Sequence, residues 1–392
     1  MNVIRTLQPV GQGGFYTENF IVEGTQGFNE ELYVVYDCGS ESKAKLKTSI
    51  RAAIPQNKEI EILFISHFDS DHVNGIKELR SHHAIKRVVM PQIDGLEWYY
   101  ILTDSINHNK DADYAVIRDL RNAIQGIPAI QVSPLDDEEG FGRQWGESPV
   151  AFDDIPNPRI IPSGTKLPLT QFGQADWIFM PVNSGNGQLI SQLKRHLEKL
   201  IAAQMGVGSI DLSRMSDDII PIINTYRKEI NDIYKRYFGN ANNASMLLYS
   251  GLNNASHPTT TRIHYYNNSS EYFVRRSYRF YPQHDKEACL YTGDANLLDV
   301  RQVRNIQSQI SPLTSRIGLM QIPHHGSINN FSLSAYRDLG VKHCVLFVSY
   351  GTRNKYGHPS THLIGSLLTS GNPIASITEC RDSAMYEVIE VL

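Results

Sequence analysis

The chain has 392 residues, 41% of them hydrophobic, and a formal net charge of −4, a composition typical of a globular protein. This charge argues against a protein that coats nucleic acid, because such proteins carry a strong basic excess, although an enzyme can still meet nucleic acid at its active site. Neither a membrane span nor a signal peptide is expected, and four widely separated cysteines favour a reduced, cytoplasmic protein without a disulfide framework.

The first ninety residues alternate between strand and helix patterns. Short runs rich in β-branched and aromatic residues predict strands at 20–22, 32–36, 60–65 and 87–90. Apolar residues at helical spacing predict helices over 43–54 and 73–84. This alternation indicates an α/β fold built in layers.

The middle of the chain, about 95–239, interrupts that pattern, and we interpret it as a partly helical insertion. It contains two strongly helical segments, 188–205 and 216–238, together with short strand-like runs among prolines. These helices fit ordinary amphipathic packing, and their place in the chain also suggests a cap over a site. The core would then comprise about 1–94 and 240–392 of one domain.

Metal-binding residue types follow several apolar strands directly. The strand at 60–65 leads to His67, Asp69, Asp71 and His72. Later apolar runs at 287–291, 317–322 and 345–349 are followed by Asp294, by His324 and His325, and, after a loop, by His358. Since α/β folds tend to bind ligands at the carboxyl ends of strands, we expect these side chains to form one site.

The segment 67–72 has more ligand types than one ion needs. Two imidazoles and two carboxylates supply mixed nitrogen and oxygen ligation, which suits Zn²⁺, Mn²⁺ or Fe²⁺. With Asp294 and a late histidine, two ions about 3.5–4 Å apart become feasible, and they would activate a bridging water as the nucleophile. An EF-hand is rejected, because Val73 and Arg80 occupy positions where that loop needs ligands.

At this point the sequence resembles the metallo-β-lactamase superfamily, whose HxHxDH signature here reads His67-x-Asp69-x-Asp71-His72. The branch with an aspartate in second place, which includes the C-terminal hydrolase domain of the ComEC competence proteins and the phosphorylcholine esterases, is the most similar. Its other motifs are matched at Val10–Gly13, Tyr36–Gly39, Asn242–Ser245, Thr292–Asp294, Pro323–Ser327 and Tyr356–Pro359. Gly14 departs from the first of these motifs, which has an aspartate there, and the glycine-rich stretch 11–14 otherwise reads as a turn.

The resemblance implies an αββα sandwich with two metal ions, zinc or manganese, at one edge. One ion would use Asp71, His72, Asp294 and His324, and the other His67, Asp69 and the shared Asp294. The histidine that usually precedes the bridging aspartate is missing, and Asn242 or Asn243 lies in its place, so this second ion has fewer ligands. Asp71, His325 and His358 are the expected catalytic residues, and the sequence leaves open which of His324 and His325 binds metal.

Phosphodiester hydrolysis, of nucleic acid or a nucleotide, is the leading functional hypothesis. An anionic substrate needs cations near such an acidic site, and Tyr272–Tyr281 interleaves arginines with aromatics in a suitable way. That segment also fits a solvated β-hairpin strand. Two alternatives are hydrolysis of a small ester, such as a phosphorylcholine or lactone-type substrate, and a non-catalytic metal-binding interaction module.

Overall fold

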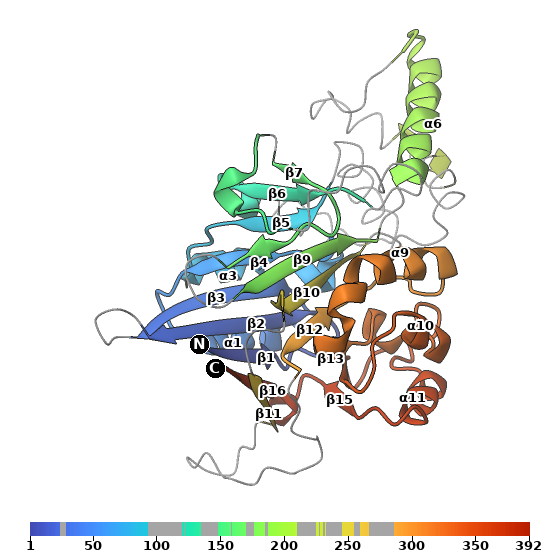
Figure 1. Ribbon diagram of the computed structural model, residues 1–392. Coiled ribbons are helices and arrows are strands. Elements are labelled where there is room, and N and C mark those ends of the chain that lie inside the picture. The colour runs from blue at the N-terminus through green and yellow to red at the C-terminus, as the bar shows by residue number, and fades with distance from the viewer. Residues whose placement is uncertain are drawn as a thin grey trace.

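The computed structural model describes residues 1–23, 29–92, 120, 122–134, 148–157, 159–169, 176–184, 187–209, 225–226, 228–229, 232, 245–254, 259–265 and 286–392. In this part of the chain two β-sheets face each other, and helices lie on their outer faces (Figure 1).

The first sheet has nine strands in the order β11-β16-β1-β2-β3-β4-β5-β6-β7. Their bounds are β1 (Asn2–Leu7), β2 (Phe15–Glu23), β3 (Asn29–Cys38), β4 (Ile60–Phe64), β5 (Val88–Pro91), β6 (Ala129–Val132), β7 (Ile160–Ile161), β11 (Thr259–Tyr265) and β16 (Met385–Val391). The pairs from β3 to β7 are parallel, and the pairs from β11 to β3 are antiparallel.

The second sheet has seven strands in the order β15-β14-β13-β12-β10-β9-β8. Their bounds are β8 (Leu167–Pro168), β9 (Trp177–Asn183), β10 (Met246–Leu252), β12 (Ala288–Tyr291), β13 (Ile317–Gln321), β14 (Val345–Ser349) and β15 (Ile374–Ile377). The four strands from β12 to β15 are parallel, so their carboxyl ends reach one edge of the sheet.

Helices cover both outer faces. On the first sheet lie α1 (Lys43–Ala53), α2 (Ser70–Val73) and α3 (Ile76–His82), and on the second α9 (Val300–Ile310), α10 (Leu333–Asp338) and α11 (Thr361–Leu368) (Figure 1). Four short 3₁₀ segments complete the described elements in these regions: η1 (Phe152–Asp154), η6 (Ser311–Arg316), η7 (His324–Gly326) and η8 (Arg381–Ser383). Helix α6 (Gly187–Met205) extends away from the layers.

Three apolar cores hold these layers together. The central core fills the space between the sheets with aromatic rings, for example Phe64 of β4 against Phe179 of β9, whose centroids lie 5.3 Å apart. Each outer core joins one sheet to its helices. Strands β4, β13 and β14 are buried along their whole length because both of their faces are covered, whereas β16 alternates between buried and partly buried residues. The structure thus confirms the predicted α/β sandwich of αββα type.

The helix predicted over 73–84 begins later in the structure, as α3 at Ile76, and the separate helix α2 ends at Val73. A continuous helix would need a hydrogen bond from the Gly75 amide to the Asp71 carbonyl oxygen. Instead, the Gly75 amide donates to the carbonyl oxygen of Cys38, and the Asp71 carbonyl oxygen accepts from the Gly14 amide. A Cβ atom on Gly75 would lie only 2.8 Å from Cys38 Sγ. Close packing against β3 therefore interrupts the helical pattern.

The range 95–239, interpreted above as an insertion, contributes strands to both sheets. Strands β6 and β7 extend the first sheet, and β8 and β9 extend the second. Helix α6 lies where a helix is predicted over 188–205, whereas most of 216–238 lies outside the described residues. The division into core and insertion remains a prediction, but part of this range belongs to the sandwich.

Candidate metal centre

The predicted site residues come together where strands of both sheets end. His67 follows β4, Asp294 follows β12, and His324 and His325 lie in η7 after β13. In the first sheet β3 and β4 are parallel neighbours, as β12, β13 and β14 are in the second. Segments more than two hundred residues apart in the chain therefore meet at one edge of the sandwich.

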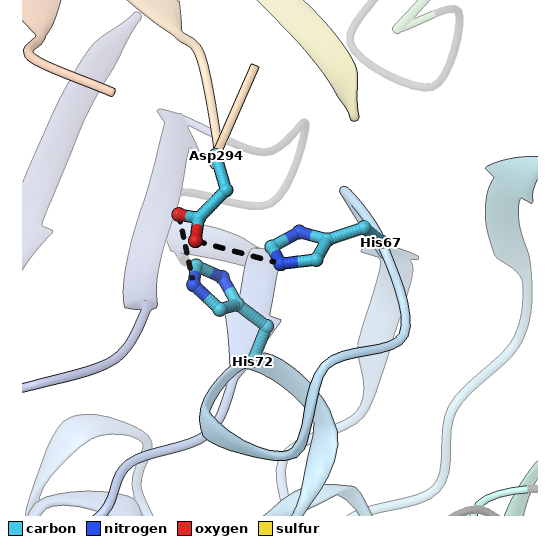
Figure 2. A group of neighbouring side chains, drawn as sticks. All are labelled: His67, His72 and Asp294. Carbon is cyan, nitrogen blue, oxygen red and sulfur yellow. Dashed lines mark ion pairs between the residues drawn. The ribbon is translucent and has the colours of Figure 1, made fainter. Parts of the chain in front are cut away.

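A first group of potential metal ligands comprises His67, His72 and Asp294, all buried (Figure 2). His72 Nε2 lies 3.2 Å from Asp294 Oδ1, and His67 Nε2 lies 3.8 Å from Asp294 Oδ2. Figure 2 shows both imidazole rings turned toward this one carboxylate. The Asp294 carboxylate thus lies between the two histidines, where a bridging ligand would be.

A second group comprises Asp71, His72 and His325, so His72 is common to both groups. His325 Nε2 lies 3.1 Å from Asp71 Oδ2 and 4.0 Å from Asp294 Oδ2. Within each group the potential ligand atoms lie within 4.8 Å of one another. Two adjoining clusters of nitrogen and oxygen atoms therefore occupy this edge.

The Nδ1 atoms of these histidines are engaged away from the cluster. His72 Nδ1 lies 2.8 Å from Asp37 Oδ2, and His325 Nδ1 lies 2.9 Å from the carbonyl oxygen of Ser349 at the end of β14. A carbonyl oxygen or a carboxylate can only accept a hydrogen bond, so each Nδ1 donates. In a neutral imidazole the Nε2 lone pair then faces the cluster, which is the form that binds metal.

Ser66 orients His67 in the same way. Its hydroxyl donates to Asp37 Oδ2 at 2.7 Å, so the oxygen can accept a hydrogen bond from His67 Nδ1 at 2.8 Å. Ser245 Oγ lies 3.2 Å from the same nitrogen and accepts from the Asp294 amide at 3.0 Å. Asp37, Ser66 and Ser245 were not predicted as site residues. Asp37 directly follows the apolar run 32–36, just as the predicted candidates follow their own apolar runs. The same pattern could therefore have identified it.

Unpartnered buried atoms in the cluster show that these residues fit a metal. Buried Nε2 atoms of His67 and His72, and buried Oδ1 of Asp294, have no hydrogen-bond partner among the described residues. Lone pairs of two imidazoles would otherwise face carboxylates at close range, which is unfavourable unless a proton or a cation lies between them. The donor set, imidazole nitrogens with carboxylate oxygens, suits Zn²⁺ or Mn²⁺, so the residues fit a divalent ion.

The pKa values of His72 and His325, though not that of His67, reflect the negative charge of the neighbouring carboxylates. Burial lowers the pKa of His72, but the carboxylates of Asp294 and Asp37 outweigh burial and raise this pKa well above its ordinary value. At His325 burial is likewise outweighed, by Asp294 and by the hydrogen bond to Asp71, and the pKa is raised. Burial, with the neighbouring His72, lowers the pKa of His67 to about 4. The cluster therefore attracts positive charge, which either protons or metal ions can supply.

Backbone strain separates the two adjacent histidines. His324 and His325 have φ angles of 48° and 53°, in the left-handed region that non-glycine residues seldom adopt. Their rings consequently diverge, with planes at 80° to each other. His325 is buried and completes the second group, whereas His324 is partly exposed and has Nδ1 3.7 Å from Asp294 Oδ2. His325 thus belongs to the tighter group, whereas the set that the resemblance implied contained His324.

Two further predicted residues lie at the rim of the cluster. Asp69 has a side chain that is 45% exposed, with Oδ2 3.7 Å from His67 Nε2. His358 is half-buried, and its ring centroid lies 5.8 Å from that of His324. Neither belongs to the two tight groups. Asn242, Asn243 and the arginine-rich segment 272–281 lie outside the described residues.

Three glycines hold the motif 67–72 by close backbone approach. A Cβ atom on Gly13 or on Gly39 would lie 2.5 Å from the carbonyl oxygen of Asp71. A Cβ atom on Gly14 would lie 2.9 Å from His72 Nδ1. The stretch 11–14 is a turn, as predicted, and it also positions the metal motif, which the sequence did not indicate.

The family comparison agrees with this description. Residues 20–162 match the family model of the metallo-beta-lactamase superfamily, which confirms the resemblance over that part of the chain and supports a metal-dependent hydrolase. A crystal structure of a long form RNase Z from yeast matches with 12% identity and a TM-score of 0.30, covering 89% of this chain and 37% of that one. No curated protein matches the sequence. The narrower branch within the superfamily remains a prediction.

The helices in the described part of the chain are all too short or too polar to span a membrane.

Proposed function

We propose that the protein is a metal-dependent phosphodiesterase, most simply a nuclease. The observation that carries this proposal is the pair of adjoining ligand groups that share His72 and contain buried, unpartnered Nε2 and Oδ1 atoms. Two divalent ions suit phosphodiester hydrolysis, because they compensate the carboxylates that would otherwise repel an anionic substrate.

In this proposal Asp71, His72, His325 and Asp294 hold one ion, and His67, Asp69 and Asp294 hold the other. His325 replaces His324 in the set that the resemblance implied, because its Nε2 lies 3.1 Å from Asp71 Oδ2 and its Nδ1 is oriented by Ser349. The second ion has fewer ligands among the described residues and is the weaker of the two. Zinc and manganese both suit the donor atoms.

The ions, when bound, would supply a nucleophile at neutral pH and neutralise charge on the phosphoryl oxygens. The chain's own residues would transfer the protons of the reaction. The Asp71 side chain is 21% exposed, so its carboxylate can also accept a proton from an attacking water. His324 and His358 lie at the more exposed side of the cluster, where one of them can donate a proton to the leaving oxygen.

Hydrolysis of a chromogenic phosphodiester tests this function directly. We expect turnover of bis(p-nitrophenyl) phosphate with Mn²⁺ or Zn²⁺, and its loss on chelation. Asp71→Asn should lower kcat by more than about 100-fold, since changes in residues that merely support metal ligands already cost 10- to 100-fold. Asp338→Asn, an exposed aspartate on α10, is the matched control and should leave kcat unchanged.

Metal content and substrate range separate the alternatives. Elemental analysis should give one to two divalent ions per chain. Stoichiometric metal without turnover of any ester would refute the enzyme and favour a metal-binding module. Turnover of a phosphorylcholine or lactone-type ester, but of no oligonucleotide, would favour the small-ester hydrolase instead.

A further inference from the structure

The loop that follows β14, residues 351–358, extends from the candidate metal centre to the protein surface. It begins directly after Tyr350, next to Ser349, whose carbonyl oxygen accepts from His325. Arg353, Lys355 and Tyr356 are exposed, and Tyr356 retains 46% of its accessible surface. The exposed Tyr356 ring thus lies beside the ammonium group of Lys355 and close in the chain to the site.

Asn354 holds this loop in one conformation. Its amide nitrogen donates to the carbonyl oxygens of Gly351 and His358 at 2.7 and 2.6 Å. Its amide oxygen accepts from the backbone N–H groups of Tyr356 and His358, each at 3.1 Å. Because one side chain forms hydrogen bonds with four backbone groups, it fixes the backbone positions of Tyr356 and His358.

Contacts on two sides fix the loop relative to the metal centre. The Tyr356 hydroxyl donates to Oε1 of Glu41, which lies in the segment after β3, at 2.7 Å. The Ser360 amide donates to the carbonyl oxygen of Gly326 at 2.9 Å, and a Cβ atom on Gly326 would lie 2.5 Å from Pro359 Cβ. The loop is therefore packed directly on the turn that carries His324 and His325.

A row of side chains leads outward from the cluster. The ring of His358 lies 5.8 Å from that of His324, and the ring of Tyr356 lies 6.1 Å from that of His358, with the two planes only 19° apart. Lys355 Nζ lies 5.5 Å from the Tyr356 ring centroid. Moving away from the metal ligands, a substrate would meet imidazole, then a flat phenol ring, then an ammonium group.

This order of groups matches one substrate chemistry. Asp71 and Asp294 make the centre acidic, so an anionic chain needs cations nearby, and an exposed aromatic ring favours a flat partner. Building on the proposed function, we propose that residues 351–358 bind single-stranded nucleic acid, with an unpaired base against Tyr356 and an adjacent phosphate paired with Lys355. A duplex offers no free base face to that ring and should bind less well.

Arg353 supplies a matched control within the same loop. It interacts electrostatically with Glu379, whose carboxylate accepts from the Thr352 amide at 3.0 Å. Removing either Lys355 or Arg353 changes the net charge of the protein equally, but only Lys355 lies beside the Tyr356 ring. A difference in affinity between the two variants therefore reports the position of the removed cation and not the total charge of the protein.

Binding and kinetics of oligonucleotides test the inference. We expect Tyr356→Ala to raise the Kd for a fluorescein-labelled, hydrolysis-resistant phosphorothioate strand, and the KM for the natural strand, by about 5- to 150-fold with little change in kcat. Tyr356→Phe keeps the ring and loses the hydrogen bond to Glu41, so it should bind nearly as wild type. Lys355→Ala should reduce the slope of log Kd against log salt by about 0.7, and Arg353→Ala should not.

Four results would overturn the inference: equal losses in Tyr356→Phe and Tyr356→Ala, no loss in either, equal salt slopes for the two cation variants, or equal affinity for duplex. Equal losses in the two tyrosine variants would assign Tyr356 to anchoring the loop through Glu41. Turnover of bis(p-nitrophenyl) phosphate separates this failure from failure of the proposed function. If the wild-type protein hydrolyses that ester while Tyr356→Ala binds strands normally, the function stands and the inference falls.

Discussion

Asp37 is the residue on which the orientation of the metal cluster depends most. It is fully buried, and its carboxylate accepts from the Ser66 amide, from the Ser66 hydroxyl and from His72 Nδ1. Through these contacts one carboxylate sets the ring orientation of both His67 and His72. Such outer carboxylates fix the tautomer of a ligating histidine and raise its basicity.

Asp37→Asn should weaken metal binding without unfolding the protein. Asparagine has the same size, but its amide nitrogen cannot accept from Ser66 or His72, so His72 loses the partner that keeps Nε2 free of a proton. We expect the Kd for Zn²⁺ to rise by roughly 10- to 100-fold, measured by competition with a chromophoric chelator. Circular dichroism checks the fold, and unchanged zinc affinity in a folded variant would contradict the role given to Asp37.

At the scale of elements, the motif 67–72 is held by backbone contacts from two other segments. The turn at 11–14 and the end of β3 approach the Asp71–His72 backbone so closely that glycine is required at 13 and 39. These contacts also break the helical pattern between α2 and α3. The sequence predicted a helix from Val73, whereas tertiary packing ends α2 at Val73 and starts α3 at Ile76.

Gly39→Ala tests that close approach. The added Cβ would lie 2.5 Å from the Asp71 carbonyl oxygen, and neither backbone segment can move freely. We expect the free energy of unfolding to fall by about 1–3 kcal/mol, as for other overpacked sites, and metal content to fall with it. Calorimetry and elemental analysis measure the two effects.

Gly365→Ala is the matched control for this substitution. Gly365 lies inside α11, and a Cβ atom added there would meet no atom within 4 Å, so alanine should be neutral or stabilise the helix by up to about 1 kcal/mol. Equal behaviour of the two alanine variants would show that the approach at Gly39 is not restrictive.

At the scale of the whole molecule, a buried ionic network joins the two sheets at Arg5. Arg5 pairs with Glu18 and Glu387 within the first sheet and donates to the carbonyl oxygens of Glu287 and Ser250 beside the second. Arg316 pairs with Glu287, so three buried carboxylates face two guanidinium groups. Glu387 Oε1 and Glu287 Oε2 have no hydrogen-bond partner among the described residues.

Glu387 should make stability depend on pH. Burial raises its pKa from 4.5 to about 7, although Arg5 acts in the opposite direction. The folded protein then binds a proton more tightly than the unfolded chain does, so the free energy of unfolding should fall as pH rises from about 4.5 to 7. Glu387→Gln mimics the protonated form, so it should raise Tm relative to wild type at pH 8 and have little effect at pH 5. The corresponding gain in the free energy of unfolding at pH 8 should be about 1–3 kcal/mol.

Glu390→Gln is the control, because Glu390 lies on the same strand with a side chain that is 39% exposed. It should leave the pH dependence of Tm unchanged, as measured by differential scanning fluorimetry. If Glu387→Gln instead lowers Tm equally at both pH values, Glu387 is ionised throughout and serves Arg5 as a permanent partner.

The amino-acid sequence by itself determined the residue types of the candidate metal centre and the local elements that carry them. Apolar runs predicted β4, β12, β13 and β14, and the residues directly after them predicted His67, Asp294 and the histidine pair. These features depend on neighbours in the chain, so periodicity and spacing suffice to identify them. Family resemblance then supplied the αββα arrangement.

Tertiary structure alone decided how those residues act together. The proposal of His325 as a ligand rests on its Nε2 lying 3.1 Å from Asp71 Oδ2, and spacing in the sequence does not reveal that distance. The sharing of His72, the role of Asp37 and the contact of Tyr356 with Glu41 join segments far apart in the sequence. Distances between such segments are set by sheet order and by packing of the whole core, so no local pattern in the chain encodes them.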